Sequence, residues 1–229
     1  MLTVEKLNVS YGRAQVLFDV DVELQAGSLM CVMGRNGVGK TTLLNAVMGV
    51  VPTGSGRVLF EGRDVTKTPT HARVKAGMGY VPQGHETFGQ LTVAENLWVT
   101  LEAVGGPRTA VDEALDLFPA LRKFLKRRAG FLSGGQAQQL AIAQALVTGP
   151  KLLILDEPTE GIQPSIILEI EGAIAELHRS GLAILVVEQY LEFALRLADA
   201  FVVLDAGEVV HSGSREELGD DRVRRLLAV

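Results

Sequence analysis

The chain has 229 residues, which at about 150 residues per domain fits one core with a smaller lobe better than two full domains. Hydrophobic residues make up 47% and charged residues 21%, a balance that excludes a disordered chain, a collagen-like repeat and a disulfide scaffold. The formal net charge of −5 gives no basic excess to neutralise a nucleic-acid backbone, so we expect no nucleic-acid partner.

The sequence also indicates where in the cell the protein is located. The single cysteine, Cys31, lies in an apolar run and cannot form an internal disulfide, which favours a reducing environment and a buried thiol. No apolar run approaches the roughly 18 residues of a membrane span, and residues 1–5 lack the charged and apolar segments of an export signal. We therefore expect a soluble cytoplasmic protein.

The first predicted elements in chain order are β-strands. Residues 14–25 alternate apolar and polar side chains, the period of a half-buried strand, and Ala26-Gly27 supplies a turn. The apolar positions of this pattern are Val16, Phe18, Val20, Val22 and Leu24. Residues 29–33 are continuously apolar instead, which suits a strand covered on both faces.

Residues 92–148 have a helical pattern without an apolar strand. Thr92 and Glu95 predict a capping box at the start of a helix, and Gly105-Gly106-Pro107 ends that helix. A basic cluster at 122–128 is interpreted as a solvated helix face, with contact to anionic lipid headgroups as the alternative. We predict a helical lobe inserted into the sheet domain.

The second half of the chain returns to buried strands. Apolar runs occur at 152–155, 183–187 and 201–204, and an amphipathic helical pattern spans 164–180. This alternation predicts an α/β fold: a mostly parallel sheet flanked by helices, an antiparallel β part at the N-terminus and the inserted helical lobe. We assign 1–90 and 149–229 to the α/β core and 91–148 to the helical subdomain of one domain, 1–229.

Residues 34–41, GRNGVGKT, match the phosphate-binding pattern G-x-x-x-x-G-K-[ST] between a predicted buried strand and a predicted helix. Glycines let backbone N–H groups turn towards phosphate oxygens, Lys40 adds a mobile positive charge, and the Thr41 hydroxyl suits Mg²⁺. The alternative is a glycine-rich turn that carries a lysine by chance, which the flanking strand and helix disfavour. The predicted nucleotide-binding residues here are Gly34, Arg35, Asn36, Gly37, Val38, Gly39, Lys40, Thr41 and Thr42.

Residues 151–157, KLLILDE, form an apolar strand that ends in two acids. Strand ends beside a phosphate loop are where open α/β sheets bind ligands. We predict that Asp156 holds the metal through water and that Glu157 orients or deprotonates the water that attacks the γ-phosphate. Alone, this pattern is equally compatible with acids that end a strand or cap a helix.

Residues 132–136, LSGGQ, precede another predicted helix. Ser133 can cap that helix while the glycines keep the backbone open, which predicts a second phosphate-facing helix start. Two chains facing head to tail could each offer this segment to the other's nucleotide. Ser133, Gly134, Gly135 and Gln136 are the candidate residues, although Ser-Gly-Gly alone is an ordinary helix start.

With these three motifs in this order, the whole chain resembles the ATP-binding subunit of ABC transporters, built on a P-loop ATPase core. The resemblance implies an ATPase that uses ATP and Mg²⁺, with the nucleotide sandwiched between one subunit's P-loop and the other's LSGGQ. It implies that Tyr11 stacks on adenine and that Gln83 contacts Mg²⁺ and senses the membrane partner. It assigns Thr41, Gln83 and Asp156 to the metal, and Glu157 to catalysis.

Three positions depart from the family pattern. Gln189 stands where a histidine usually contacts the γ-phosphate, and an amide can position but cannot carry a proton. Gln163 replaces an aspartate of the loop that crosses the dimer, and Gln144 replaces an arginine after LSGGQ. Because Glu157 is present, we still predict hydrolysis, with Gln189 and Gln83 as the other catalytic-site residues and a slower rate than in relatives with the histidine.

The resemblance extends to a branch of the family. Glu188-Gln189 and Glu160-Gly161 are similar to importers of branched-chain amino acids and of urea or short amides. Arg35, Val38 and Gln83 favour the urea type over the branched-chain amino acid type. The implied partners are membrane-spanning permease subunits and a second ATPase subunit. A heterodimer is expected in the cell, with a homodimer as the alternative for the isolated chain, peripheral on the cytoplasmic face of the membrane.

The permease is expected to dock near residues 83–97. Phe88, Leu91 and Trp98 offer apolar surface there, beside polar Gly84, His85 and Glu86. The alternative is that these aromatics pack the helical lobe.

Other function classes have weaker support. Soluble ABC-type ATPases of DNA repair or translation would show coiled-coil insertions, zinc-binding cysteines or tandem halves, and a P-loop kinase or GTPase would lack LSGGQ. A nucleotide-binding scaffold without turnover is the non-enzyme alternative.

Overall fold

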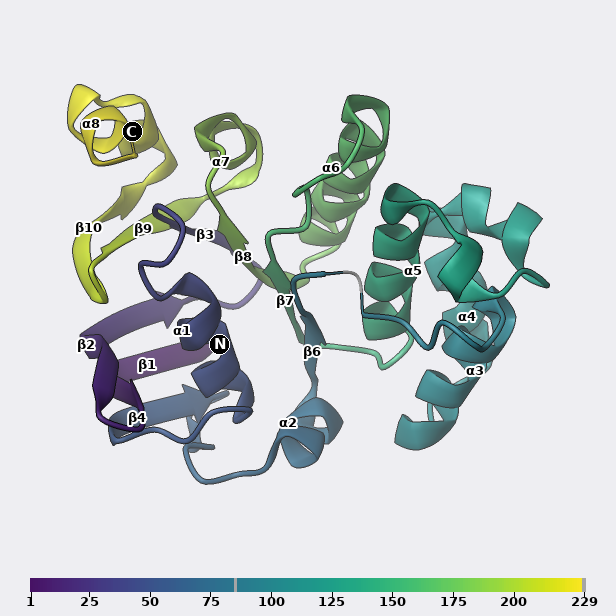
Figure 1. The fold of residues 1–229 in the computed structure, drawn as a ribbon, viewed down its shortest axis with the longest axis horizontal. Helices are drawn as coiled ribbons and strands as arrows, with labels where there is room; N and C mark the ends of the chain where they lie inside the picture. Colours follow the sequence, from purple (N-terminus) through teal and green to yellow (C-terminus); the bar gives the residue numbers. More distant parts are fainter. Residues whose placement is uncertain (85, 228–229) are drawn as a thin grey trace.

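The computed structural model describes residues 1–84 and 86–227, which form two β-sheets and a group of helices (Figure 1). The larger sheet has six strands in the order β10-β9-β3-β8-β7-β6. Its strands are β3 (Leu29–Met33), β6 (Met78–Val81), β7 (Leu152–Asp156), β8 (Ala183–Glu188), β9 (Ala200–Asp205) and β10 (Glu208–Ser214). All neighbouring pairs are parallel except β9 and β10. The predicted mostly parallel sheet is therefore confirmed.

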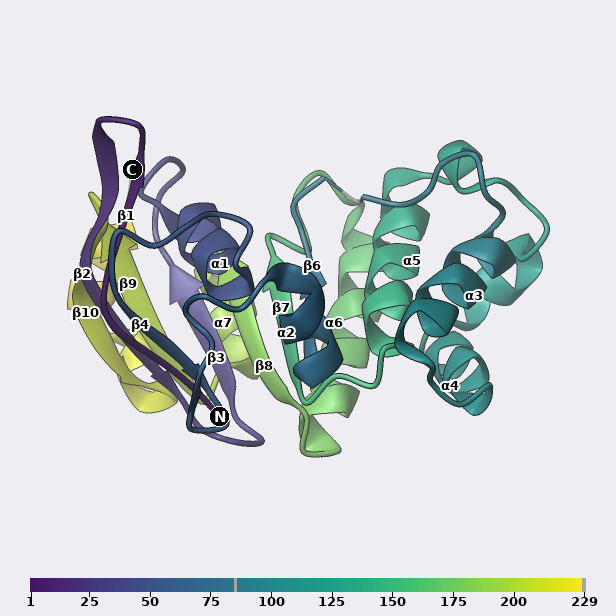
Figure 2. The same cartoon turned by 90° about the horizontal axis from the view of Figure 1, so that it is seen from below.

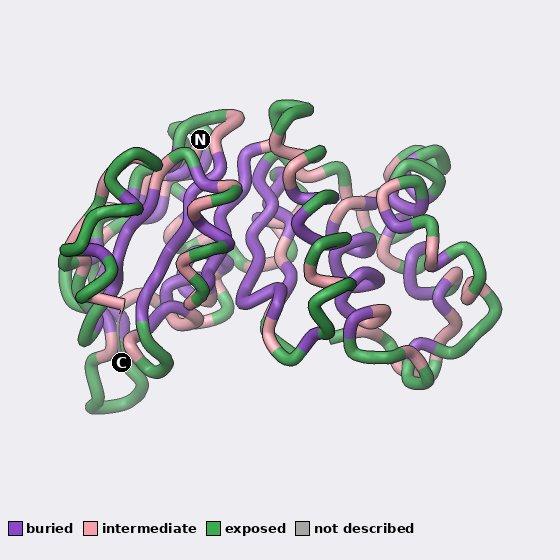
Figure 3. The backbone as a smooth tube through the Cα atoms, turned by 90° about the horizontal axis from the view of Figure 1, so that it is seen from above, coloured by how far each residue is buried: buried purple, intermediate pink, exposed green. Residues whose placement is uncertain are grey.

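The apolar runs are continuous because each strand is packed on both faces (Figure 3). Cys31, Leu153 and Val186 belong to a core shared with the helical lobe and α6. The intervening residues, such as Val32 and Ile154, belong to a second core shared with α1 and the smaller sheet. Alternate side chains of one strand thus fill different cores.

The smaller sheet is the predicted antiparallel part. It comprises β1 (Leu2–Tyr11), β2 (Ala14–Leu24), β4 (Ser55–Phe60) and β5 (Arg63–Asp64) in the order β2-β1-β4-β5. The expected alternation holds at Val20, Val22 and Leu24, but Phe18 is 38% exposed and Leu17 is buried in its place. The register against β1 shifts between these parts of β2, at Asp19 with its φ of 43°. Such a bulge moves the preceding side chains to the other face.

The helical lobe contains α3 (Val93–Val104), α4 (Thr109–Leu117), η1 (Pro119–Phe124), η2 (Ala129–Phe131) and α5 (Gly134–Leu146). The capping box of α3 is present: Glu95 N donates to Thr92 Oγ1 at 3.2 Å, and Thr92 N donates to Glu95 Oε2 at 2.7 Å. Gly105, at φ 70°, ends the helix. The subdomain boundaries at 91 and 148 remain a prediction.

The remaining helices are α1 (Lys40–Met48), α2 (Thr70–Ala76), α6 (Pro164–Arg179), α7 (Leu191–Leu197), η3 (Arg215–Gly219) and α8 (Asp221–Leu227). Within residues 1–84 and 86–227, no helix combines the length and apolar character needed to cross a membrane.

The fold brings several chain segments to one edge of the large sheet. Because β3, β7 and β8 are parallel, their carboxyl ends at Met33, Asp156 and Glu188 lie together. The loop before α1 follows β3 directly. Helix α5 ends shortly before β7 begins, so its N-terminus also faces this edge (Figure 2).

Candidate functional site

The loop between β3 and α1 needs its glycines for steric reasons. Gly34, Gly37 and Gly39 have φ values of 151°, 82° and 109°, which disfavour residues with a Cβ. A Cβ on Gly34 would lie 2.3 Å from the Leu204 carbonyl oxygen, and one on Gly39 would lie 2.7 Å from Leu17 Cδ2. The loop therefore lies tightly between β2 and the end of β9.

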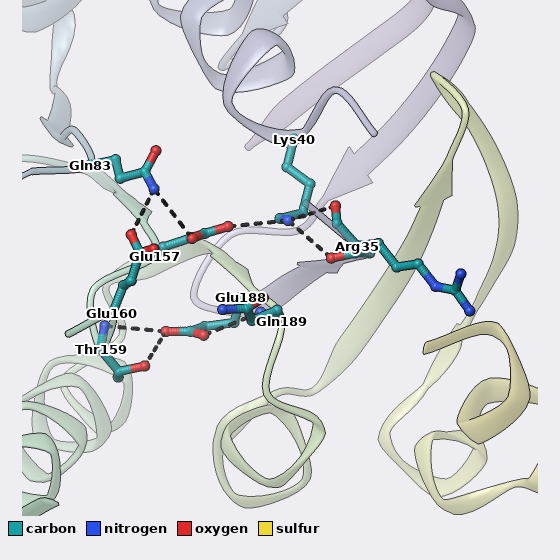
Figure 4. A network of polar contacts seen from close by, with 9 residues as sticks. Arg35, Lys40, Gln83, Glu157, Thr159, Glu160, Glu188 and Gln189 are labelled. Carbon is teal, nitrogen blue, oxygen red and sulfur yellow. Dashed lines mark hydrogen bonds and ion pairs between the residues drawn. The ribbon is translucent and has the colours of Figure 1, made fainter. Parts of the chain in front are cut away.

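Lys40 begins α1 and is 4% exposed. Its Nζ donates to the carbonyl oxygens of Gly34 at 2.9 Å and Arg35 at 3.0 Å (Figure 4). The same atom lies 3.1 Å from Glu157 Oε1, and Glu157 is 6% exposed. This buried ion pair joins the loop at 34–42 to the end of β7. With the two carbonyl contacts, it holds the Lys40 side chain over the loop that precedes it.

Gln83 follows β6 and reaches the same carboxylate. Its Nε2 donates to Glu160 Oε2 at 2.7 Å and lies 3.4 Å from Glu157 Oε2. The amide oxygen points away from both glutamates in Figure 4. The contact with Glu160 was not predicted from the sequence, where Glu160 served only as a mark of the family branch. Glu160 follows Glu157 closely in the sequence, and this was the available signal that it lies near the same site.

Asp156, the last residue of β7, is 1% exposed. Neither of its carboxylate oxygens has a hydrogen-bond partner of good geometry among the described residues. Burial raises the pKa of Asp156 to about 6, and the nearby Thr41 hydroxyl opposes part of that rise. A buried carboxylate without a partner is costly, so this group is suited to a cation supplied with a ligand.

A cleft of about 210 Å³ opens over these groups. Gln83 and Glu157 line it, together with most of the predicted phosphate-binding residues. The phosphate-binding residues in the lining are Asn36, Gly37, Gly39, Lys40, Thr41 and Thr42. Val16 also lines the cleft and was not predicted to do so, because nothing in the pattern of its strand distinguishes it from its neighbours.

Other predicted residues of the loop act through the backbone. The carbonyl oxygens of Gly34 and Arg35 hold Lys40. The carbonyl oxygen of Val38 accepts from Gly207 N at 3.0 Å. The Arg35 side chain extends away from Lys40 and Glu157 in Figure 4.

Tyr11 and Gln189 are also outside the cleft lining. Tyr11 is 49% exposed at the end of β1. Gln189 is half-buried after β8, and its backbone N donates to Glu188 Oε2 at 3.2 Å. Their predicted contacts with adenine and γ-phosphate remain predictions.

The LSGGQ segment forms the start of α5. Gln136 N donates to Ser133 Oγ at 3.4 Å, and Ser133 N donates to Gln136 Oε1 at 3.1 Å, which completes a capping box. Ser133 and Gly134 are exposed. Gly135 is buried instead, and a Cβ there would lie 2.7 Å from Ile166 Cγ2, so this glycine permits close packing of α5 on α6.

Two positions that depart from the family pattern, Gln144 and Gln163, have neutral side chains where charged ones are usual. Gln144 Nε2 lies 3.2 Å from Asn96 Oδ1 and 3.4 Å from Thr100 Oγ1, which bridges α5 and α3 without a charge. Gln163 is the N-cap residue of α6, before Pro164 at its first position.

The described residues contain no group of three or more histidine, cysteine, aspartate and glutamate side chains that could hold a metal ion. Mg²⁺ commonly uses one or two carboxylates and completes its shell with water and substrate phosphates. The Asp156 carboxylate, the Thr41 hydroxyl and the Gln83 amide oxygen are the protein groups that this chemistry would use.

Comparison with known proteins shows the family. A family model described as ABC transporter matches residues 17–160. The "Probable branched-chain amino acid transport ATP-binding protein LivF" of Archaeoglobus fulgidus is 42% identical over 95% of this chain and 94% of its own length. The "High-affinity branched-chain amino acid transport ATP-binding protein BraG" of Pseudomonas aeruginosa is 39% identical over 98% of this chain and 97% of its own.

Solved structures give the same result. "Structure of ATP binding subunit of ABC transporter" matches with a TM-score of 0.86 and 27% identity, over 100% of this chain and 95% of that one. The predicted α/β fold with its inserted helical lobe is therefore confirmed. The chain belongs to the ABC transporter family and is an ATP-hydrolysing, ATP-binding subunit of that family.

Proposed function

We propose that this subunit drives import of a small solute by hydrolysing ATP in the cleft at 34–42. The observation that carries the proposal is the convergence of Lys40, Gln83 and Glu157 on this cleft, beside the unpartnered carboxylate of Asp156. A phosphate loop, a cation and a buried general base are the parts that phosphoryl transfer to water requires.

The residues present fit Mg²⁺. Asp156, Thr41 and Gln83 would hold the ion. The amide oxygen of Gln83 points away from the two glutamates while its Nε2 donates to Glu160 (Figure 4). When bound, Mg²⁺ neutralises charge on the phosphate oxygens. Asp156 must be ionised for this role, which its raised pKa permits at neutral pH.

The reaction uses the groups already on the cleft. Phosphate oxygens compete with Glu157 for Lys40 Nζ, so ATP binding frees the Glu157 carboxylate. Glu157 then takes a proton from water as the water oxygen bonds to the γ-phosphorus and the bond to the bridging oxygen of ADP breaks. Gln189 positions phosphate or water by hydrogen bonding alone.

A second ATPase subunit completes the site. The exposed Ser133 and Gly134 present the N-terminus of α5 to a neighbouring molecule, where backbone N–H groups and the helix dipole attract phosphate. Tyr11, exposed at the tip of β1, is available to stack on adenine. We propose that the paired subunit in the cell is a different chain, and that the isolated chain pairs with a second copy of itself through the same surfaces.

The permease docks, in this proposal, on a groove of about 290 Å³ between the α/β core and the helical subdomain at 91–148. Tyr80, Glu86, Phe88, Thr100 and Gln144 are among its lining residues. Phe88 is 55% exposed, so its ring is available to a partner. Of the docking residues named from the sequence, Leu91 is half-buried, Trp98 stacks beneath the Arg108 guanidinium at 5.7 Å, and His85 lies outside the described residues. In this proposal the chain lies on the cytoplasmic face of the membrane.

Two observations bear on the transported solute, and they favour different solutes. The relatives named for branched-chain amino acid transport, at 42% and 39% identity, favour that solute class. Arg35, Val38 and Gln83 favour urea or short amides as the second candidate. We give branched-chain amino acids the first place, because near full-length identity includes many more positions than three loop residues.

Uptake of labelled leucine and labelled urea by cells that lack this chain tests the proposal. Loss of leucine uptake alone supports the first candidate, and loss of urea uptake alone supports the second. Loss of neither contradicts an import function for these solutes and favours a soluble, non-transport ABC ATPase.

Replacing Phe88 by alanine tests the docking groove. Transport should fall while nucleotide binding stays unchanged, because Phe88 does not line the nucleotide cleft. Uptake at the wild-type rate in cells that carry F88A would contradict docking at this groove.

A further inference from the structure

The turn after β7 holds Glu157 in an unusual conformation. Glu157 has a φ of 46°, in the left-handed region that residues with a Cβ rarely adopt. Residues stay in such regions when the surrounding structure fixes them. One restraint is the hydrogen bond from Glu157 N to the Val187 carbonyl oxygen, at 3.0 Å, which docks the turn on β8.

A second restraint comes from Glu188, the last residue of β8, which is 1% exposed. Its Oε1 accepts from Thr159 Oγ1 at 2.7 Å and from Thr159 N at 3.3 Å. Its Oε2 accepts from Gln189 N at 3.2 Å. Figure 4 shows this carboxylate between the segment at 157–160 and the residue that follows β8.

Burying the Glu188 carboxylate costs free energy, which suggests that the carboxylate has a specific role. Burial raises the pKa of Glu188, while its three hydrogen bonds oppose that rise by favouring the ionised form. No salt bridge to Glu188 occurs among the described residues. An apolar residue would fill the space without burying an acid.

We propose that Glu188 is a positioning residue for Glu157, which it holds through Thr159 so that the Glu157 carboxylate faces Lys40 and Gln83. The inference rests on the proposed role of Glu157 as general base. The same carboxylate holds the backbone of Gln189, so the two segments that approach the γ-phosphate share one anchor. Glu188 itself stays buried and does not contact the nucleotide.

The inference separates two kinetic constants. The loop at 34–42 supplies the nucleotide-binding groups, and no hydrogen bond from Glu188 or Thr159 to that loop is found in the described part of the chain. Loss of the anchor should therefore lower kcat and leave KM for ATP unchanged. A merely structural role would lower the melting temperature without this separation.

The test uses steady-state ATPase measurements on the full-length chain. Thr159→Val removes the hydroxyl and keeps the shape, and Glu188→Gln keeps the shape and removes the charge. Each should lower kcat by about tenfold, the size expected for loss of a hydrogen bond to a charged group, with KM within about twofold of wild type. Thr159→Ser, which keeps the hydroxyl, should restore most of the rate.

Ser180→Ala is the control, because it removes a hydroxyl that also donates at 2.7 Å, to the Leu177 carbonyl oxygen, away from the turn. Its kcat should equal that of wild type. Wild-type kcat in T159V and E188Q, or equal losses in T159S and T159V, would overturn the inference. Absence of ATPase activity in wild type itself would instead contradict the role of Glu157 on which the inference rests.

Discussion

Gly34→Ala should destabilise the protein, because position 34 has no room for a methyl group. The new Cβ would lie 2.3 Å from the Leu204 carbonyl oxygen and 2.9 Å from Val38 Cγ2, where ordinary contact begins at 3.4 Å. The first neighbour is backbone at the end of β9 and cannot rotate away. The φ of 151° adds a second cost, because it is a conformation that alanine disfavours.

The two costs can be estimated. Backbone strain of this kind costs about 1–3 kcal/mol, and forced overpacking costs about another 1–3 kcal/mol. The free energy of unfolding should therefore fall by about 2–6 kcal/mol, a large part of the roughly 5–15 kcal/mol of a typical domain. ATP affinity should fall as well, because relief of the clash displaces the loop whose carbonyl oxygens hold Lys40.

Urea denaturation, monitored by circular dichroism without nucleotide, measures the first effect. Gly12→Ala is the control: Gly12 also has a positive φ, 62°, but no described atom lies within 4 Å of the added Cβ. It should lose only about 1–2 kcal/mol. An unfolding free energy for G34A equal to that of G12A would refute the steric argument.

Two buried charged side chains, Asp156 and Arg73, give further tests. The Mg²⁺-dependent part of ATP affinity should fall as pH drops through about 6, because protonation of Asp156, whose pKa burial raises to that value, removes a metal ligand. Titration calorimetry with Mg²⁺ and with EDTA would measure it, and an unchanged difference at pH 5 would contradict the role of Asp156. Without metal, the sign of the stability effect is opposite: a raised folded-state pKa favours folding below the unfolded value of 3.8, and this contribution is lost as pH rises to about 6. In Asp156→Asn, the melting temperature of the metal-free protein should therefore depend less on pH over this range. A pH dependence equal to that of wild type would contradict the raised pKa of Asp156. Arg73→Met should lower the unfolding free energy by about 2–4 kcal/mol, since the buried guanidinium donates to the carbonyl oxygens of Ala46, Val47, Thr66 and Thr68; a loss below about 1 kcal/mol in urea denaturation would show that these oxygens find other donors.

The sequence predicts those parts of the fold that local patterns determine. Runs such as 152–155 are apolar because both faces are covered, so their strands could be recognised, and the glycines of the 34–41 loop are required by backbone conformation. Strand β6 was missed because its four residues include a glycine and a half-buried tyrosine. The inward position of Leu17 was also missed, because it depends on a bulge at Asp19.

The contacts that assemble the site were less accessible. The pairs Lys40–Glu157, Gln83–Glu160 and Thr159–Glu188 join residues that are 29 or more positions apart in the chain. Each depends on how closely the ends of neighbouring strands approach, which no motif specifies. The Glu188-Gln189 pair was visible as a motif, but the anchoring of Thr159 follows only from the packing of β7 against β8.

In the proposed dimer, one subunit's loop at 34–42 and the other's segment at 133–136 bind the same nucleotide. Glu157→Gln should abolish phosphate release and keep ATP-dependent association, which sedimentation velocity measures on the full chain. Adding Ser133→Asp retains a good helix cap but places a negative charge where the triphosphate should lie. E157Q should associate in the presence of ATP and E157Q/S133D should not. Equal association of both variants would show that the segment at 133–136 does not bind the nucleotide.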